Sequence, residues 1–338
     1  MNLSLLSRYK SAFTSYSFGK IFLKYPPLFY SIEATNICNY RCKYCPQGTP
    51  DEKGIKKGQM STVLFESILK KIISLKPVSQ IYLTGNGEPL MHPDLEEFIF
   101  LSNKYGFTPS FSSNGSLFSK ERIKSLLDSG KFSLTVDFSP SKDIYETYRS
   151  GGSWDTVYAN LKNLLVSKKK LGRDYPKMEI RDMSTIALIS QKERDKSLSD
   201  LKGLFKDLPV DRFSQLKVHR WIGNIDQKVI SPQVKGNKYK LCTHPWSLFV
   251  ITWKGEVLAC CRDFGSEYVM GKIEGEDGIL DIWNNDRIKF LREALVSKKP
   301  DKINICKNCD RPWTGGSVAR SKPEMIKKIL WERIAGSV

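Results

Sequence analysis

The placement of the cysteines constrains the fold of this 338-residue chain more than any other feature. The first group is Cys38, Cys42 and Cys45, and the second is Cys242, Cys260, Cys261, Cys306 and Cys309. Disulfide frameworks belong to small secreted domains, and the N-terminus has no signal-peptide pattern. Clustered cysteines in a long chain instead indicate metal or cluster binding. We therefore expect a cytoplasmic protein whose distant segments fold around metal centres.

The first group offers three thiolates and no nearby fourth ligand. Structural zinc usually takes four ligands, and iron–sulfur clusters usually take four cysteines. Three ligands leave one coordination position open for a substrate or cofactor, so this spacing favours a catalytic site over a purely structural metal site. The alternative is a zinc site that a distant cysteine or histidine completes.

Strand and helix patterns alternate from Leu28 to about residue 220, which predicts βα units around a parallel sheet. The expected strands are Phe29–Ala34, Gln80–Thr84, Thr108–Ser112, Phe132–Phe138, Met178–Asp182 and Arg212–Val218. Between them, apolar residues recur at helical spacing. Parallel barrels carry their chemistry on the loops after the strands. The first cysteine group and the turn Gly85-Asn86-Gly87-Glu88-Pro89 both follow expected strands.

The segment Cys38–Cys45, C-x3-C-x2-C with an aromatic residue before its last cysteine, resembles the signature of the radical S-adenosylmethionine (radical SAM) superfamily. The resemblance implies that the three cysteines hold a 4Fe–4S cluster whose open iron binds the amino and carboxylate groups of SAM. The turn is similar to the family's GGEP segment beside that amino group, with Gly85, Gly87, Glu88 and Pro89 matching and Asn86 departing. The implied fold class is α/β, a partial (β/α)6 TIM-like barrel.

The same resemblance implies further contacts to SAM. The residues are Tyr44 near the adenine, Ser112, Ser113 and Asn114 in a turn after the third strand, Ser133 and Asp137 on the fourth strand near the ribose, and Arg181 near the carboxylate. Two alternatives stay open. Ser112–Gly115 is also an ordinary Asn-Gly turn, and Arg181 is equally suited to a salt bridge.

The second cysteine group lies in a different pattern. Residues Ser247–Trp253 and Glu256–Cys260 predict a β-hairpin, and Ile279–Val296 predict one helix. The spacing of Cys242, Gly255, Cys260, Cys306 and Cys309 resembles the SPASM extension of radical SAM enzymes in its shortened "twitch" version. The resemblance implies an auxiliary 4Fe–4S cluster on Cys242, Cys260, Cys306 and Cys309. Cys261 is then a neighbour, although an exchange with Cys260 and a four-cysteine zinc site stay open.

These patterns predict four parts of the chain. They are an N-terminal helical extension over 1–27, the radical SAM partial barrel over 28–225, a small auxiliary-cluster domain of hairpin plus helix over 240–315, and a C-terminal helix over 316–338.

The net charge is +18, from 54 Lys and Arg against 36 Asp and Glu. The basic residues are spread out, and no zinc-finger or RRM signature is present. We therefore expect no nucleic-acid partner. The alternative suggested by the net charge is an iron–sulfur protein that binds nucleic acid. No apolar run approaches the roughly 20 residues of a membrane span. A basic surface suits an acidic reduced donor of the flavodoxin or ferredoxin type.

The resemblance implies reductive cleavage of SAM to a 5′-deoxyadenosyl radical that removes a substrate hydrogen atom. The spacing of the second cysteine group resembles that of a butirosin-type aminoglycoside dehydrogenase subgroup. The segment before Leu28 is short for the leader-peptide recognition domain that many peptide maturases carry. We expect oxidation of a small polar substrate, a sugar, aminocyclitol or nucleotide-linked sugar. A phosphorylated substrate would employ His219 and Arg220, our candidates for a catalytic role, whose alternative is surface solvation and capping. The alternative functions are a peptide or protein maturase and a sugar epimerase.

Overall fold

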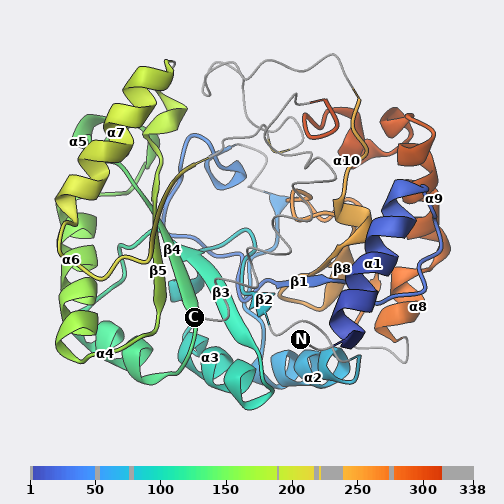
Figure 1. The fold of residues 1–338 in the computed structure, drawn as a ribbon, viewed down its shortest axis with the longest axis horizontal. Coiled ribbons are helices and arrows are strands. Elements are labelled where there is room, and N and C mark those ends of the chain that lie inside the picture. Colours follow the sequence, from blue (N-terminus) through green and yellow to red (C-terminus); the bar gives the residue numbers. More distant parts are fainter. Residues whose placement is uncertain are drawn as a thin grey trace.

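The computed structural model describes residues 3–49, 54–75, 80–188, 190–216, 221, 239–273 and 278–313. One nine-stranded sheet runs through it in the order β6-β5-β4-β3-β2-β1-β7-β8-β9 (Figure 1). The first six strands are parallel to their neighbours and follow one another in chain order. The sheet does not close. The predicted α/β partial barrel is therefore confirmed.

The parallel strands lie close to where the sequence predicts them. They are β1 (Phe29–Ile32), β2 (Gln80–Tyr82), β3 (Thr108–Ser113), β4 (Ser133–Phe138), β5 (Lys177–Asp182) and β6 (Arg212–Gln215). The helices between them are α2 (Thr62–Ile73), α3 (Leu95–Lys104), α4 (Lys120–Asp128), α5 (Lys142–Tyr148), α6 (Trp154–Lys170) and α7 (Gln191–Leu204). Serine hydroxyls cap the first turn of α2, α4, α5, α6 and α7. Such caps satisfy backbone amides that the helix leaves without partners.

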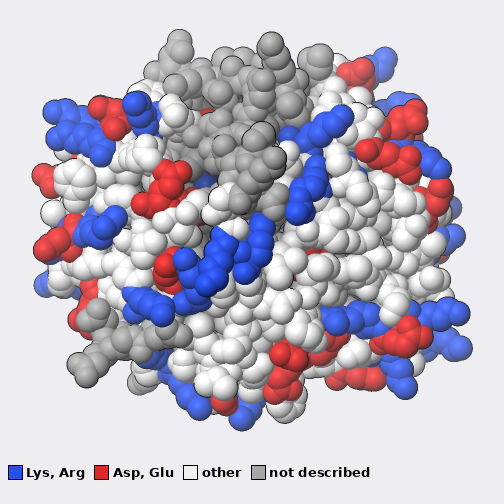
Figure 2. Space-filling view, turned by 180° about the vertical axis from the view of Figure 1, so that it is seen from behind, with Lys and Arg blue, Asp and Glu red and all other residues white. Residues whose placement is uncertain are grey.

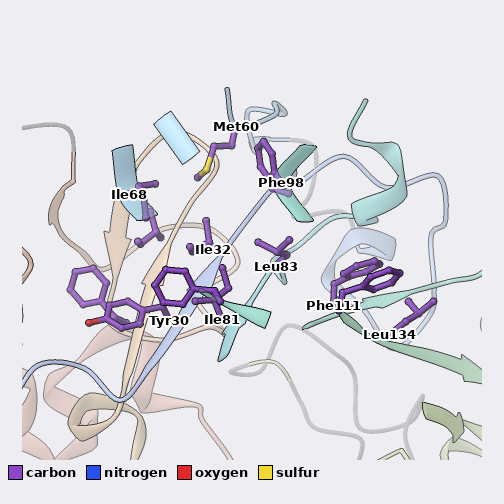
Figure 3. Close-up of a cluster of buried hydrophobic side chains, with 14 of the residues drawn as sticks. Tyr30, Ile32, Met60, Ile68, Ile81, Leu83, Phe98, Phe111 and Leu134 are labelled. Carbon is purple, nitrogen blue, oxygen red and sulfur yellow. The ribbon is translucent and has the colours of Figure 1, made fainter. Parts of the chain in front are cut away.

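Burial alternates along β3, β4 and β5 and separates two faces of the sheet. The buried face packs on helices, as the side chains of Ile81, Phe98, Phe111 and Leu134 illustrate (Figure 3). The half-buried face is mostly polar and carries Ser110, Ser112, Ser133, Thr135, Asp137, Lys177, Glu179 and Arg181. The register pairs Thr135 with Glu179, and Asp137 with Arg181. A polar surface therefore crosses three neighbouring strands.

The C-terminal part continues the barrel sheet. Strand β7 (Leu248–Ile251) pairs in parallel with β1 along its full length. Strands β8 (Glu256–Leu258) and β9 (Val269–Lys272) follow as antiparallel neighbours. Helix α1 (Leu3–Ser17) lies on this side of the molecule (Figure 1), where the Tyr16 and Trp246 rings meet at 5.9 Å.

The prediction of one helix over Ile279–Val296 is wrong. The segment forms α8 (Ile279–Trp283) and α9 (Asp286–Val296). Asn285 separates them because its side chain accepts from the Ile288 amide and begins α9. Asn284 is held by Leu23, whose amide and carbonyl both bond to its side chain. The short helix α10 (Asn304–Lys307) carries Cys306.

The division into four parts stays a prediction, and residues 316–338 lie outside the described part of the chain. Within the described ranges, no helix has the length and apolar character needed to cross a bilayer. Lys and Arg side chains form a diagonal band across one face of the molecule (Figure 2).

Candidate functional site

The loop after β1 brings the first three thiols together. Backbone bonds fix the loop to the end of α5, from the Arg41 amide to the Ser150 carbonyl (2.9 Å) and from the Lys43 amide to the Tyr148 carbonyl (3.0 Å). Burial, assisted by the neighbouring thiols, raises the pKa of Cys38 to about 11 and of Cys45 to about 12. A bound metal favours the deprotonated thiolates. The donor set therefore fits a cluster that has three protein ligands.

The turn after β2 packs directly against this loop. The Glu88 amide donates to the Ile37 carbonyl at 2.9 Å. A Cβ atom on Gly87 would lie 2.4 Å from the Thr35 carbonyl oxygen, and one on Gly85 would lie 2.3 Å from Cγ of Glu33. Only glycine permits this approach at both positions. At Asn86, the departure from the family pattern, both the backbone amide and the side chain hydrogen-bond to Glu33.

Glu33 is a residue that the sequence reasoning missed. Its buried carboxylate accepts from the Asn86 amide at 2.8 Å and from the Trp253 amide at 3.2 Å. One side chain thus joins the end of β1, the turn after β2 and the turn between β7 and β8. Burial raises its pKa, and the two amides oppose that effect. A single acidic residue after a strand gives no signal of such a role.

Gln47 and Lys57 were also missed. Gln47 is buried two residues after Cys45, and its amide group donates to the Asn36 carbonyl at 2.8 Å and to the Asn86 carbonyl. Its carbonyl oxygen accepts from Lys57 Nζ at 2.7 Å. The cysteine loop is therefore tied at both ends, by the α5 segment and by this network.

Glu88 and Asn114 join the turn to the end of β3. The Glu88 carboxylate accepts from the Asn114 amide at 2.7 Å and from the Leu90 amide at 3.2 Å. The Asn114 side chain donates to Asn39 and accepts from Ser116. The Ser113 hydroxyl accepts from the Gly115 amide. Protein partners therefore engage Ser113, Asn114 and Glu88, whereas Ser112 lies on the polar face of the sheet.

Asp137 pairs with two arginines at the end of β4. Its Oδ1 contacts Arg181 Nε, and its Oδ2 lies 3.1 Å from Arg149 Nη2. Burial alone would raise the Asp137 pKa, but the two guanidinium groups hold it below its ordinary value. Arg149 is buried, was missed by the sequence reasoning, and lies 5.6 Å from the centre of the Tyr44 ring. Arg181 forms the salt bridge that the sequence left open.

Two polar atoms here lack partners. Tyr44 Oη and Arg149 Nε are buried, and neither has a hydrogen-bond partner among the described residues. Buried polar groups are normally paired, so these atoms fit a bound polar ligand. Ser133 lies at the opposite end of β4, roughly 13 Å along the strand from Asp137. Thr135, on the same face, is the nearer hydroxyl.

The second cysteine group also converges. Burial raises the pKa of Cys306 well above its ordinary value, and the nearby thiols of Cys260, Cys242 and Cys309 raise it further. Cys260 is half-buried, whereas Cys261 is exposed. His244 Nδ1 lies 3.6 Å from Cys260 Sγ and 4.0 Å from Cys261 Sγ. His244, Cys260 and Cys261 each offer a donor atom within 4.8 Å of the other two. The ligand set expected from the sequence, with Cys260 in preference to Cys261, therefore stays a prediction. His219 and Arg220 lie outside the described residues.

Comparisons with known proteins agree with this geometry. Residues 32–170 match the radical SAM superfamily, and residues 242–310 match the SPASM iron–sulfur cluster-binding domain. The S-adenosyl-L-methionine-dependent 2-deoxy-scyllo-inosamine dehydrogenase of Niallia circulans is 25% identical over 283 residues, which cover 82% of this chain and 91% of that protein. A cofactor-modifying protein for tungsten-containing aldehyde ferredoxin oxidoreductase from Pyrococcus furiosus is 26% identical over 77% of this chain and 82% of its own.

Solved structures show the same fold. BtrN in complex with AdoMet and 2-DOIA superposes with a TM-score of 0.55 at 21% identity, covering 88% of this chain and 96% of that one. The anSMEcpe protein with bound AdoMet gives a TM-score of 0.58 at 16% identity, covering 92% and 98%. The matches place an iron–sulfur-binding region at each cysteine group. The chain therefore belongs to the radical SAM superfamily and carries a SPASM iron–sulfur cluster-binding domain after its partial barrel.

Proposed function

We propose that this radical SAM enzyme oxidises a secondary alcohol of a small polar substrate, a sugar, aminocyclitol or nucleotide-linked sugar. The observation that carries the proposal is the polar face of β3, β4 and β5, which ends at Asp137 and Arg181 beside the first cysteine loop. Hydroxyl, carboxylate and guanidinium groups on one surface suit a ligand rich in hydroxyl groups. The similarity to a dehydrogenase named for 2-deoxy-scyllo-inosamine supports the same substrate class.

When bound, the first cluster and SAM would supply a radical that removes a hydrogen atom from the substrate alcohol, and an auxiliary 4Fe–4S cluster would supply an acceptor for the remaining electron while the hydroxyl proton leaves to solvent. The protein contributes position and the exclusion of competing reactions. Cys38, Cys42 and Cys45 would hold the first cluster, and Cys242, Cys260, Cys306 and Cys309 would hold the second.

The chain's own groups orient the ligands. Burial raises the pKa of the Tyr44 hydroxyl well above its ordinary value, so this hydroxyl stays protonated and can donate a hydrogen bond. Arg149 Nε is a second buried donor nearby. Asp137 stays ionised between its two arginines and holds them in place. The turn Gly85–Pro89 is fixed to the cysteine loop, so bound SAM would meet a preformed surface.

The test is anaerobic incubation with SAM, a reductant and a panel of aminocyclitols, sugars, sugar phosphates and nucleotide sugars. We expect one molecule of 5′-deoxyadenosine for each substrate that loses 2 Da, because two hydrogens leave the alcohol. Unchanged mass with uptake of one solvent deuterium would indicate an epimerase. Turnover of a peptide and of none of the panel would indicate a maturase. Either result would overturn the proposal.

We also propose a reduced flavodoxin or ferredoxin-type protein as the electron donor. The basic band in Figure 2 supports an acidic partner, because opposite charges speed encounter. Deoxyadenosine formation with such a donor should fall as salt rises, whereas the rate with a small chemical reductant should change little. Equal salt dependence of the two rates would refute charge-guided docking.

A further inference from the structure

We infer that Arg262 raises the reduction potential of the cluster bound by the second cysteine group, and that Asp310 positions this arginine and opposes its effect. The inference rests on the proposed ligand set of Cys242, Cys260, Cys306 and Cys309. It concerns how readily that cluster accepts an electron, and it is independent of the identity of the substrate.

Arg262 lies inside the second cysteine group. Its side chain is 4% exposed, and its Nη1 lies 3.9 Å from Cys309 Sγ. Its backbone amide donates to Cys260 Sγ at 3.4 Å. One residue therefore places a buried cation beside one expected ligand and a backbone dipole beside another.

Asp310 fixes the guanidinium group. Its Oδ1 accepts from the same Nη1 at 2.6 Å, and its side chain is 13% exposed. Because Asp310 directly follows Cys309, the ion pair is attached to the ligand loop itself. A buried arginine with one carboxylate partner keeps a fixed direction toward the sulfur.

Other charged groups face these thiols as well. Arg311 is buried, donates to Thr243 Oγ1 at 3.3 Å and partly opposes the rise that burial causes in the pKa of Cys242. Asp263 faces Cys306, but its carboxylate accepts from the Glu267 and Tyr268 amides. His244 Nδ1 lies 3.6 Å from Cys260 Sγ. Arg262 differs in its direct contact from Nη1 to the sulfur of Cys309, an expected ligand.

The physical argument concerns the charge of the two oxidation states. A 4Fe–4S cluster with four thiolates gains one negative charge when it takes up an electron. A buried cation stabilises the more negative state, and low solvent access keeps that interaction strong. Arg262 should therefore favour the reduced form, and loss of the nearby carboxylate should favour it further.

The test is a potentiometric titration of the full-length reconstituted protein, followed by electron paramagnetic resonance. Signals are assigned with a variant in which Cys38, Cys42 and Cys45 are all alanine. For R262M we expect the ratio of reduced to oxidised auxiliary cluster to fall about tenfold at a fixed potential, a shift of ~59 mV for one electron. D310N should move the ratio in the opposite direction. R262K, which keeps the charge, should stay closer to wild type.

The matched control is R173M, which removes an exposed arginine from an ion pair with Asp128 and should leave the ratio unchanged. A purely structural role for Arg262 would not give opposite shifts in R262M and D310N. Normal iron content with unchanged ratios in both variants would overturn the inference. If R262M loses the cluster, the D310N variant tests the inference by itself. A ratio of reduced to oxidised cluster that does not rise in D310N would then overturn the inference. A wild-type protein without an auxiliary signal would instead refute the proposed ligand set.

Discussion

Replacing Glu33 tests whether its carboxylate joins the end of β1, the turn after β2 and the turn between β7 and β8. Glu33→Ala removes the acceptor from two backbone amides, those of Asn86 at 2.8 Å and Trp253 at 3.2 Å. A buried donor left without a partner costs about 1–3 kcal/mol. Two such donors give a loss of about 2–6 kcal/mol in the free energy of unfolding.

An unfolding entropy of roughly 2.1 cal/mol/K per residue makes 1 kcal/mol worth about 1.4 °C in a chain of this length, so Tm should fall by about 3–8 °C. The assay is thermal unfolding of the anaerobically purified protein, with SAM affinity measured in parallel. Because the Asn86 amide belongs to the turn that we expect to contact SAM, SAM binding should weaken as well. Glu33→Gln keeps one acceptor oxygen, so it should show about half the loss.

The control is Asp200→Ala, which breaks an exposed ion pair between Lys196 and Asp200 on α7. Surface pairs of this kind contribute little, so Tm should barely change. If Glu33→Ala unfolds at the same temperature as this control, the carboxylate does not connect the three segments, and the reasoning fails.

Three further predictions concern the clusters and SAM. Replacing Cys38, Cys42 and Cys45 together by alanine should abolish 5′-deoxyadenosine formation and lower the iron content from about eight atoms per chain to about four, the size of one 4Fe–4S cluster. Persistent SAM cleavage would contradict their role as ligands, and about four iron atoms in the wild type would contradict the auxiliary cluster. Cys261→Ala should leave the iron content unchanged, since the spacing from Gly255 assigns Cys260 as the ligand, and loss of a cluster would show that Cys261 is a ligand. Arg149→Met should weaken SAM binding about tenfold, a loss of ~1.4 kcal/mol, and unchanged affinity by calorimetry would show that Arg149 only supports the fold.

The barrel could be predicted because the apolar patterns of its strands and helices recur locally along the chain. Alternating apolar patterns located all six parallel strands, and the residues after β1 and β2 carried the family signature. The residues that fix these loops could not be predicted. Gln47 and Arg149 act through partners far away in the sequence, and neither position has a periodic or spacing signal. The fourth strand shows the same limit, because the pattern placed both Ser133 and Asp137 near the ribose although they lie at opposite ends of β4.

The sequence alone determined the superfamily, the order of strands and helices, and the two groups of thiols, because each depends on residue types at short spacing. Only the tertiary structure decided that β7 pairs with β1, so that the SPASM domain extends the barrel sheet. It also decided that Glu33 joins three segments, and that Arg262 lies against Cys309 Sγ while Arg149 lies against Asp137. These contacts form because buried charged and polar groups must be paired when distant segments of the chain pack together. No local pattern encodes that choice.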